Sequence, residues 1–368
     1  MGIFLLLLVA ILVAFGQSLL FGKWALSRVK YTRQFSVTEC YSGDTIEMIE
    51  VIENRKLLPV FWLRAESTIA ASLRFHSTEE TMDIDVGRRT QYHKSLFSIG
   101  PYRRIRRTHK VICARRGLFR IDQVSLTAGD LLGMNDKSKS MPVAIQLTVY
   151  PQVITMEEIP LPSHGWQGDV SVRRWIVDDP FLITGVRDYR SGDPMKRIHW
   201  KATARTGTLQ VYQHDYTAEQ RLVVYLNVMD KETTRDVVHD EELIEKGISY
   251  AATIVSDAVA RGIPVGFGHN GLRQGQPEID VRLPIGGGRE HLLAILSEMA
   301  AIELRCKLLF HDFLAQDDPI TEERCDYLLI TSHVSLLAAE QIERLKQAGH
   351  SVQTLIIEKD YESEVAAG

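Results

Sequence analysis

The stretch RLVVYLNV, residues 221–228, is an almost continuous apolar run. Runs of this kind are typical of strands that are buried on both faces of a parallel sheet, whereas a strand with one wet face alternates apolar and polar residues. Residues 221–228 therefore predict a central strand with helices packed on both of its sides.

The sequence after this run alternates between helix and strand patterns. Residues 240–262 repeat apolar side chains at helical spacing and end at Gly262, a residue typical of helix ends. A strand pattern (CDYLLITSH), a helix pattern that ends at Gly349, and a last strand pattern (SVQTLIIE) follow. The alternation predicts an open, mostly parallel α/β sheet over residues 217–368.

The residues before this layer have a different period. DTIEMIEVIEN, residues 44–54, alternates apolar and polar positions, as a half-buried antiparallel strand does. Similar short patterns continue without a convincing amphipathic helix, so residues 31–151 predict a β-sandwich-like domain. Residues 152–184 contain several Pro and Gly residues and predict a connector.

The N-terminus is strongly apolar. Residues 3–22 carry no charge over about the length that one helix needs to cross a bilayer, and Lys23 and Arg28 follow them. The pattern predicts a transmembrane anchor over residues 1–23. The positive-inside rule then predicts a single-pass protein of the cell membrane with most of its chain in the cytoplasm. A cleaved signal peptide is disfavoured, because no positive charge precedes the apolar run.

The expected fold class is therefore α+β multidomain, with an N-terminal transmembrane helix, a β-sandwich-like domain and an α/β open-sheet domain in that order. The 368 residues fit this arrangement, and the formal net charge of -4 gives no global sign of nucleic-acid binding. The four cysteines are far apart in sequence and form no C-x-x-C pair, which disfavours a zinc site and a dense disulfide framework. Scattered cysteines fit a reducing compartment.

Residues 185–216, GVRDYRSGDPMKRIHWKATARTGTLQVYQHDY, combine cations, carboxylates and aromatic rings at unusual density. One interpretation is a structural ion-pair network. Arg187 and Arg205 would then clamp carboxylates, and Trp200 would be a buried anchor. The combination of six cations and three carboxylates in one short segment favours this network.

Two other interpretations of the same segment are open. His199, Asp193 and His214 could in principle gather a transition metal, as a hydrolase would need. The basic and aromatic residues could also bind a nucleic acid, but no wider basic field surrounds them, so that interpretation is disfavoured.

The segment resembles the signature of the bacterial domain-of-unknown-function family fifty-eight. The residues that carry the resemblance are Arg187, Tyr189, Gly192, Asp193, Arg197, His199, Trp200 and Arg205. RRGLFRIDQVSLTAGDLLGM, residues 115–134, also resembles a strand pair of that family, although Leu131 stands where proline is usual.

The resemblance implies a membrane-anchored protein with a β-sandwich-like region and a C-terminal von Willebrand factor A-like domain. Such proteins are typically encoded beside a MoxR-type AAA+ ATPase, and often beside a transglutaminase-like membrane protein. The resemblance assigns no catalytic residues. This chain has one apparent span where the commonest layout has two.

A von Willebrand factor A domain holds magnesium at a D-x-S-x-S motif after its first strand. Asn227, Met229 and Lys231 occupy the corresponding positions here. A thioether and an ammonium group do not bind magnesium, which prefers oxygen ligands. We therefore expect no metal and no other cofactor at this place.

Taken together, the sequence and the resemblance lead us to expect a membrane-tethered, non-enzymatic adaptor that contacts the lipid bilayer through residues 3–22. The partner proteins that the resemblance implies are a MoxR-type AAA+ ATPase and a transglutaminase-like membrane protein. Two alternatives are a metal-dependent hydrolase that uses the His199, Asp193 and His214 cluster, and a protein that binds an envelope ligand through its β-sandwich.

Overall fold

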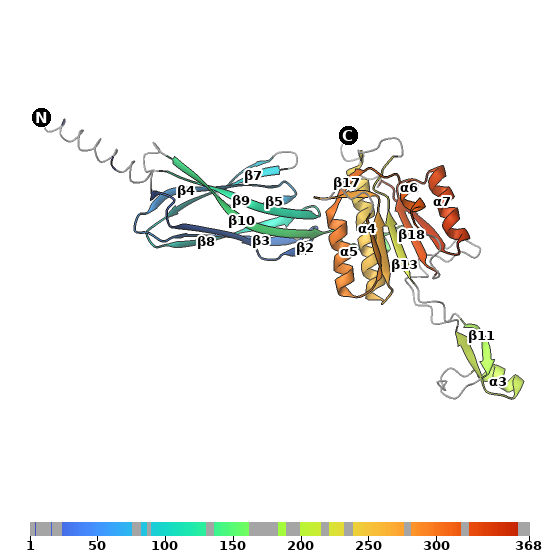
Figure 1. Ribbon diagram of the computed structural model, residues 1–368. Helices are drawn as coiled ribbons and strands as arrows, with labels where there is room; N and C mark the ends of the chain where they lie inside the picture. The colour runs from blue at the N-terminus through green and yellow to red at the C-terminus, as the bar shows by residue number, and fades with distance from the viewer. Residues whose placement is uncertain are drawn as a thin grey trace, which may run out of the picture. The chain divides into compact units, whose positions relative to one another are not determined.

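The chain forms two compact units, seen in Figure 1. The first unit comprises residues 1–152 with 299–301, and the second comprises residues 153–298 with 302–368. The computed structural model describes residues 24–75, 82–86, 90–129, 136–161, 183–188, 199–214, 221–231, 238–275, 281–317 and 324–359, together with Phe4 and Gly16.

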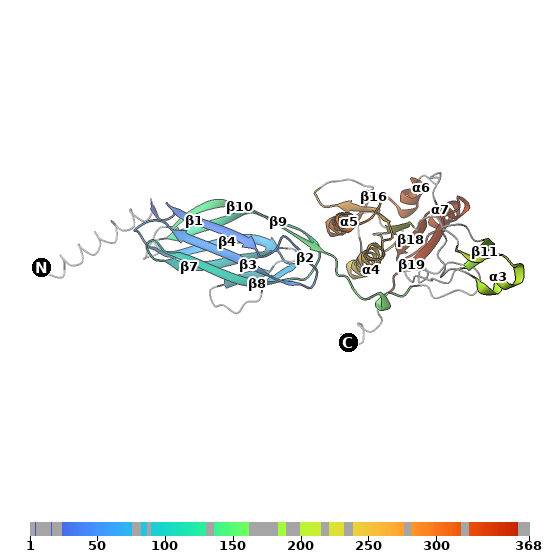
Figure 2. The same ribbon diagram turned by 90° about the horizontal axis from the view of Figure 1, so that it is seen from below.

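The first unit contains two β-sheets that face each other (Figure 2). In the four-stranded sheet the order is β1 (Val29–Phe35), β3 (Thr45–Asn54), β8 (Arg104–Cys113) and β5 (Leu73–Phe75). In the six-stranded sheet the order is β2 (Glu39–Tyr41), β10 (Asp136–Tyr150), β9 (Gly117–Gly129), β4 (Val60–Ala70), β7 (Thr90–Ile99) and β6 (Met82–Val86). All neighbours are antiparallel except β2 and β10, which run parallel.

The core of this unit lies between the two sheets. Alternate residues of β3 point inward, and Ile46, Met48 and Ile52 are buried there against Leu63 and Leu126 of the other sheet. The period-two pattern of the sequence produces this arrangement, because successive side chains of a strand point to opposite faces. The predicted β-sandwich-like domain is confirmed.

The second unit is built around a five-stranded sheet. Its order is β16 (Val281–Gly286), β14 (Val265–His269), β13 (Leu222–Leu226), β18 (Asp326–Thr331) and β19 (Ser351–Ile356). The four strands from β14 to β19 are parallel, and β16 is antiparallel at the edge. The central strand β13 is buried along its whole length, as its apolar sequence predicts.

Helices cover both faces of this sheet (Figures 1 and 2). They are α4 (Glu241–Ala260) and α5 (Arg289–Ala301) on one face, and α6 (Phe310–Ala315) and α7 (Leu336–Gln347) on the other. Asp240 caps α4, since its side chain accepts a hydrogen bond from the backbone of Leu243 at 3.1 Å. Strands β15 (Gly271–Arg273) and β17 (Ile302–Cys306) form a separate two-stranded antiparallel sheet.

Four smaller elements belong to the connector and the signature segment. A single 3₁₀ turn, η1, spans Met156–Glu158. Strands β11 (Ile183–Asp188) and β12 (Gln210–His214) pair antiparallel, and helix α3 (Trp200–Thr206) lies between them in sequence.

The expected fold class, α+β with a leading transmembrane helix, was wrong. The described residues are mostly β-sheet, because long antiparallel strands fill the first unit and an extra hairpin and edge strand join the second. Searching the described part of the chain for a helix long and apolar enough to cross a bilayer finds no candidate. Residues 3–22 lie outside the described residues except for Phe4 and Gly16.

Candidate functional site

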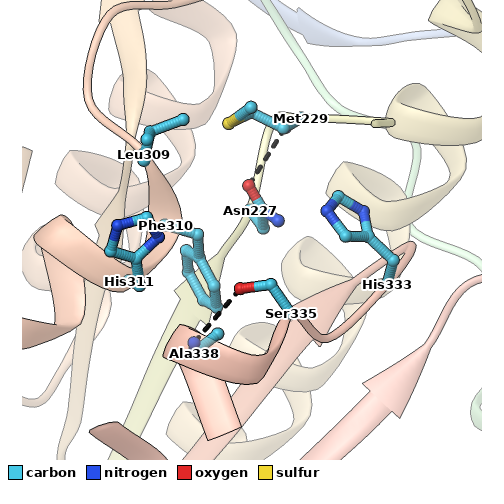
Figure 3. A pocket seen from close by; sticks show the side chains of 8 residues that line it. All are labelled: Asn227, Met229, Leu309, Phe310, His311, His333, Ser335 and Ala338. Carbon is cyan, nitrogen blue, oxygen red and sulfur yellow. Dashed lines mark hydrogen bonds between the residues drawn. The ribbon is translucent and has the colours of Figure 1, made fainter. Parts of the chain in front are cut away.

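The carboxyl ends of β13, β14 and β18 meet at one edge of the second unit's sheet, because these three strands are parallel neighbours. Open α/β sheets bind their ligands at this edge. The loops after these strands supply the residues that gather there, and the start of α7 lies beside them (Figure 3).

Three polar side chains tie these loops together. The Asn227 amide donates from Nδ2 to Oγ1 of Thr331 at 2.9 Å, and its Oδ1 accepts from Nδ2 of Asn270 at 3.0 Å. The Asn270 Oδ1 in turn accepts from the backbone N–H of Val228 at 2.8 Å. All three side chains are buried, and their hydrogen-bonding groups are engaged by neutral protein partners.

The structure places the three positions of the degenerate metal motif differently. Asn227 and Met229 are buried, whereas Lys231 is exposed. Asp230, which lies between the last two, accepts backbone hydrogen bonds from His239 at 2.7 Å and Asp240 at 2.8 Å. The Asp230 carboxylate therefore binds the backbone just before α4. The side-chain groups that remain near the end of β13 are the Asn227 amide and the Met229 thioether.

A small pocket opens at this edge, shown in Figure 3. It has about 10 Å³ of room, enough for one water molecule. His311 and His333 stand on opposite sides of Asn227 in it. Its lining is Asn227, Met229, Leu309, Phe310, His311, His333, Ser335 and Ala338. A pocket of this size does not enclose an organic substrate.

Beside the pocket the chain exposes apolar side chains. Val334 is 41% exposed, Leu336 is 87% exposed and Leu337 is 48% exposed. Ser335 caps α7 by accepting from the backbone of Ala338 at 3.1 Å, so the helix start is well formed. We call Val334, Leu336 and Leu337 the α7 surface.

The signature segment is only partly described. Tyr189, Gly192, Asp193 and Arg197 lie outside the described residues, and of Arg187 and His214 the structure describes only the backbone, in β11 and β12.

Three of its residues, His199, Trp200 and Arg205, can be placed fully. His199 is the N-cap of α3, where its Nδ1 accepts from the backbone N–H of Ala202 at 3.1 Å. Trp200 is 66% exposed and Arg205 is exposed, so the expected buried tryptophan anchor is not found. Trp200 lies in the first turn of the seven-residue helix α3, and its ring faces outward there.

A second group of polar residues lies buried between the two sheets of the first unit. Glu50 is at its centre: Oε1 accepts from Oη of Tyr31 at 2.6 Å and from Nη2 of Arg33 at 2.5 Å. Oε2 accepts from Oγ of Ser95 at 2.9 Å and lies 2.9 Å from Nε2 of His109. The network joins β1, β3 and β8 of one sheet to β7 of the other.

Arg33 extends the network further. Its Nη1 donates to Oγ of Ser67 on β4 at 2.5 Å, and its Nη2 lies 3.4 Å from Nδ1 of His93 on β7. Among the described residues, the buried His93 Nε2 has no hydrogen-bond partner. We call Tyr31, Arg33, Glu50, Ser67, His93, Ser95 and His109 the inter-sheet network.

The charges of this network fix its protonation. Burial would raise the pKa of the Glu50 carboxyl, but the hydrogen bond with His109 and the charge of Arg33 outweigh it and hold that pKa well below its usual range. Burial and then the Arg33 charge lower the pKa of His93 to about 3. Glu50 is therefore ionised and His93 neutral at pH 7.

Glu50, His93 and His109 form a group of three potential metal ligands in the described residues. The donor set alone would suit a transition metal. The guanidinium of Arg33, however, already supplies the positive charge at the carboxylate, and it also faces the His93 ring. A metal ion would have to sit beside that cation in a region of low dielectric, so the arrangement fits a buried ion pair better than a metal centre.

Sequence reasoning missed this network, although a signal was present. In the alternating stretch 45–54 the inward positions are Ile46, Met48, Glu50 and Ile52. A carboxylate at a core-facing position of a strand requires a buried partner, since an unpaired charge there is very costly.

Residues 185–342 match the family model described as "Protein of unknown function DUF58". The match covers less than half of the 368-residue chain. The DUF58 match extends from the signature segment through most of α7, and it supports the family expected from the signature residues. The von Willebrand factor A-like character of the DUF58 region stays a prediction.

Solved structures resemble part of the chain at low identity. The CARDB domain of the PF1109 protein from Pyrococcus furiosus is 13% identical over 33% of this chain and 94% of that chain, with a TM-score of 0.19. A non-cellulosomal cohesin from Archaeoglobus fulgidus is 17% identical over 35% of this chain and 94% of that chain, with a TM-score of 0.21. Likenesses this low carry no inference about function. Among curated proteins, none matches the sequence.

Proposed function

We propose that the protein is a non-enzymatic adaptor whose second unit binds a partner protein through the α7 surface. The observation that carries this proposal is the exposure of three apolar side chains within four residues, at the sheet edge where α/β proteins bind ligands. Single exposed apolar residues are normal on any surface, but clustered ones at a binding edge favour a protein contact.

The chemistry beside the α7 surface also favours binding over catalysis. The side chains of Asn227, Asn270 and Thr331 are hydrogen-bonded to one another and to nearby backbone groups. Asp230 is engaged by two backbone N–H groups, which leaves it poorly placed to act as a general base. A partner protein would therefore contact mainly the uncharged side chains of the α7 surface.

The proposed partner is a cytoplasmic AAA+ ATPase of the MoxR type, with a transglutaminase-like membrane protein as a possible further member of the assembly. The support is the signature resemblance, not the geometry. The proposed place of action is the cell membrane, with most of the chain on the cytoplasmic side, and the support is the uncharged run of residues 3–22 followed by basic residues.

The test is capture of partners by the full chain from gently solubilised membranes, with and without ATP, followed by mass spectrometry. The informative variant is Leu336→Asp, because this side chain is almost fully exposed and a carboxylate is tolerated in the first turn of a helix. The matched control is Leu57→Asp, which changes a leucine that is 76% exposed in the first unit.

We expect the wild-type chain and Leu57→Asp to recover an AAA+ ATPase in near-stoichiometric amount, and Leu336→Asp to lose it while its melting temperature stays unchanged. Recovery of the ATPase by all three proteins would refute the α7 surface as the contact. Recovery of the chain alone under both nucleotide conditions would refute the adaptor function.

A further inference from the structure

Two cysteines that are distant in sequence lie in contact inside the first unit. The Sγ atoms of Cys40 and Cys113 are 3.4 Å apart, although 73 positions separate the two residues. Both side chains are buried, and both are free thiols. Cys40 belongs to β2 in the six-stranded sheet and Cys113 ends β8 in the four-stranded sheet, so the pair connects the two layers.

The backbone around the pair is firmly held. Gly43 donates its N–H to the carbonyl of Cys113 at 2.8 Å, and Cys113 donates its own N–H to the carbonyl of Asp44 at 2.9 Å. The Asp44 carboxylate closes the turn by accepting from the N–H of Tyr41 at 2.8 Å. Residues 40–44 therefore fix Cys40 against the end of β8. A covalent S–S bond is about 2.0 Å long, so the two sulfurs need to approach by only a little over 1 Å.

We propose that Cys40 and Cys113 are a redox modification site, and that they form a disulfide which covalently links the two sheets of the sandwich under oxidising conditions. The oxidant is a small-molecule disulfide of the glutathione type. One cysteine thiolate attacks a sulfur of the oxidant, and the mixed disulfide releases one small thiol. The other cysteine then attacks the protein sulfur of that mixed disulfide and releases the second small thiol. Two cysteine thiols are oxidised and one small disulfide is reduced to two thiols.

The two thiols differ in a way that suits this order of events. The hydrogen bond between the sulfurs lowers the pKa of Cys40, while the same bond raises the pKa of Cys113. Cys40 is also the more exposed of the two. Cys40 is therefore the thiol that attacks the oxidant, and Cys113 resolves the mixed disulfide.

The other two cysteines provide an internal comparison. Cys306 and Cys325 are buried in the second unit, and the Cys306 Sγ donates to the carbonyl of Leu308 at 2.7 Å. Cys306 ends β17, and Cys325 directly precedes β18. They should stay reduced where the Cys40 and Cys113 pair does not.

The experiment uses the full chain, purified with its thiols reduced and kept folded in mixtures of oxidised and reduced glutathione. After acid quenching, the free thiols are blocked with a maleimide in denaturant, and the non-reduced digest is analysed by mass spectrometry. We expect one peptide pair linked through Cys40 and Cys113, with Cys306 and Cys325 blocked by maleimide. The oxidised chain should melt roughly 5–15 °C higher than the reduced chain, since the link closes a long loop.

The variants separate the proposed link from other effects of oxidation. Cys325→Ser should show the same rise in melting temperature as the wild type, and Cys40→Ser should show none. Mass spectrometry of the wild type alone decides the matter if Cys40→Ser fails to fold. The proposal is overturned if Cys40 and Cys113 both stay maleimide-reactive at the most oxidising poise, if the link forms only after unfolding, or if oxidation lowers the melting temperature.

Discussion

Glu50 places a carboxylate at a core-facing strand position, where an apolar side chain is usual. The other residues of the inter-sheet network contact Glu50 itself or its counter-ion, Arg33. Glu50 is fully buried, and Arg33 is buried with it. A buried ion pair adds little net stability over an apolar pair, but removal of one partner leaves the other charge uncompensated. The network therefore specifies how the two sheets face each other more than it strengthens them.

The Glu50→Gln variant tests this role at the residue scale. Gln keeps the shape of the side chain but leaves the Arg33 guanidinium buried without its carboxylate. We expect the free energy of unfolding to fall by about 3–5 kcal/mol, measured by urea denaturation of the full chain. Glu53→Gln is the control, since this residue of the same strand forms an exposed pair with Arg55 and should change stability little. Equal losses in both variants would contradict the assignment.

His93 predicts a pH dependence whose sign follows from its pKa. The folded pKa of about 3 lies below the unfolded value of about 6.5, so the unfolded chain binds a proton in that interval and the folded chain does not. The stability contribution is present above pH 6.5 and is lost as the pH falls toward 3, at up to about 1.4 kcal/mol per pH unit. Arg33, Glu50 and His109 face the ring, and Glu50 adds a loss of the same sign at lower pH.

The measurement is urea denaturation between pH 4 and 7 for the wild type and for His93→Gln. The variant lacks the titrating group, so its stability deficit should shrink as the pH falls. A deficit that stays constant across this range would show that His93 does not titrate as its surroundings require.

At the scale of elements, the residue pattern predicts what a single segment does by itself. The strand expected at residues 44–54 is β3, the apolar run at 221–228 contains β13, and the helix expected at 240–262 is α4. Each is decided by local period and by end residues. The antiparallel edge strand β16 and the pair β15 and β17 were not predicted, because pairing between distant segments leaves no periodic signal.

Cross-strand packing of β4 on β9 gives a prediction at this scale. Trp62 stands opposite Gly129, and its ring occupies the space that a Cβ on Gly129 would need. Gly129→Ala must displace the ring, so we expect a loss of about 1–3 kcal/mol in calorimetry of the full chain. Gly100→Ala is the control, because its new Cβ would meet only the Arg103 Cγ at an ordinary 3.4 Å. A loss as large in Gly100→Ala as in Gly129→Ala would argue against this explanation.

At the scale of the whole molecule, the sequence did not reveal which distant residues contact each other in the fold. The β-sandwich-like domain was predicted, but the class of the chain was wrong, since strands predominate. Nothing in the sequence indicated that Cys40 and Cys113 form a pair, because residues 73 positions apart reveal no contact in one sequence. Trp200 was expected in a core from its residue type alone, and it is exposed.

Metal content separates the adaptor from the hydrolase alternative for the intact chain. Asn227, Met229 and Lys231 offer poor ligands, and Arg33 occupies the place of a cation in the inter-sheet network. We therefore expect elemental analysis of the purified chain to find no stoichiometric zinc or manganese. Bound metal that disappears in His199→Ala would favour the hydrolase, and metal that disappears in Glu50→Gln would place an ion between the sheets.

The edges of the sandwich restrict how another protein can join it. Among the described strands, β2 and β5 have 3 residues each and β6 has 5, and all three end a sheet. Short edge strands offer few free backbone groups, which limits edge-to-edge pairing with another sheet. Among the described strands, β1 with 7 residues is a longer edge, and β10 is another, because β2 pairs only with its last residues, Thr148–Tyr150. A ligand that binds to this unit by β-augmentation would therefore pair along β1 or along the part of β10 before Thr148.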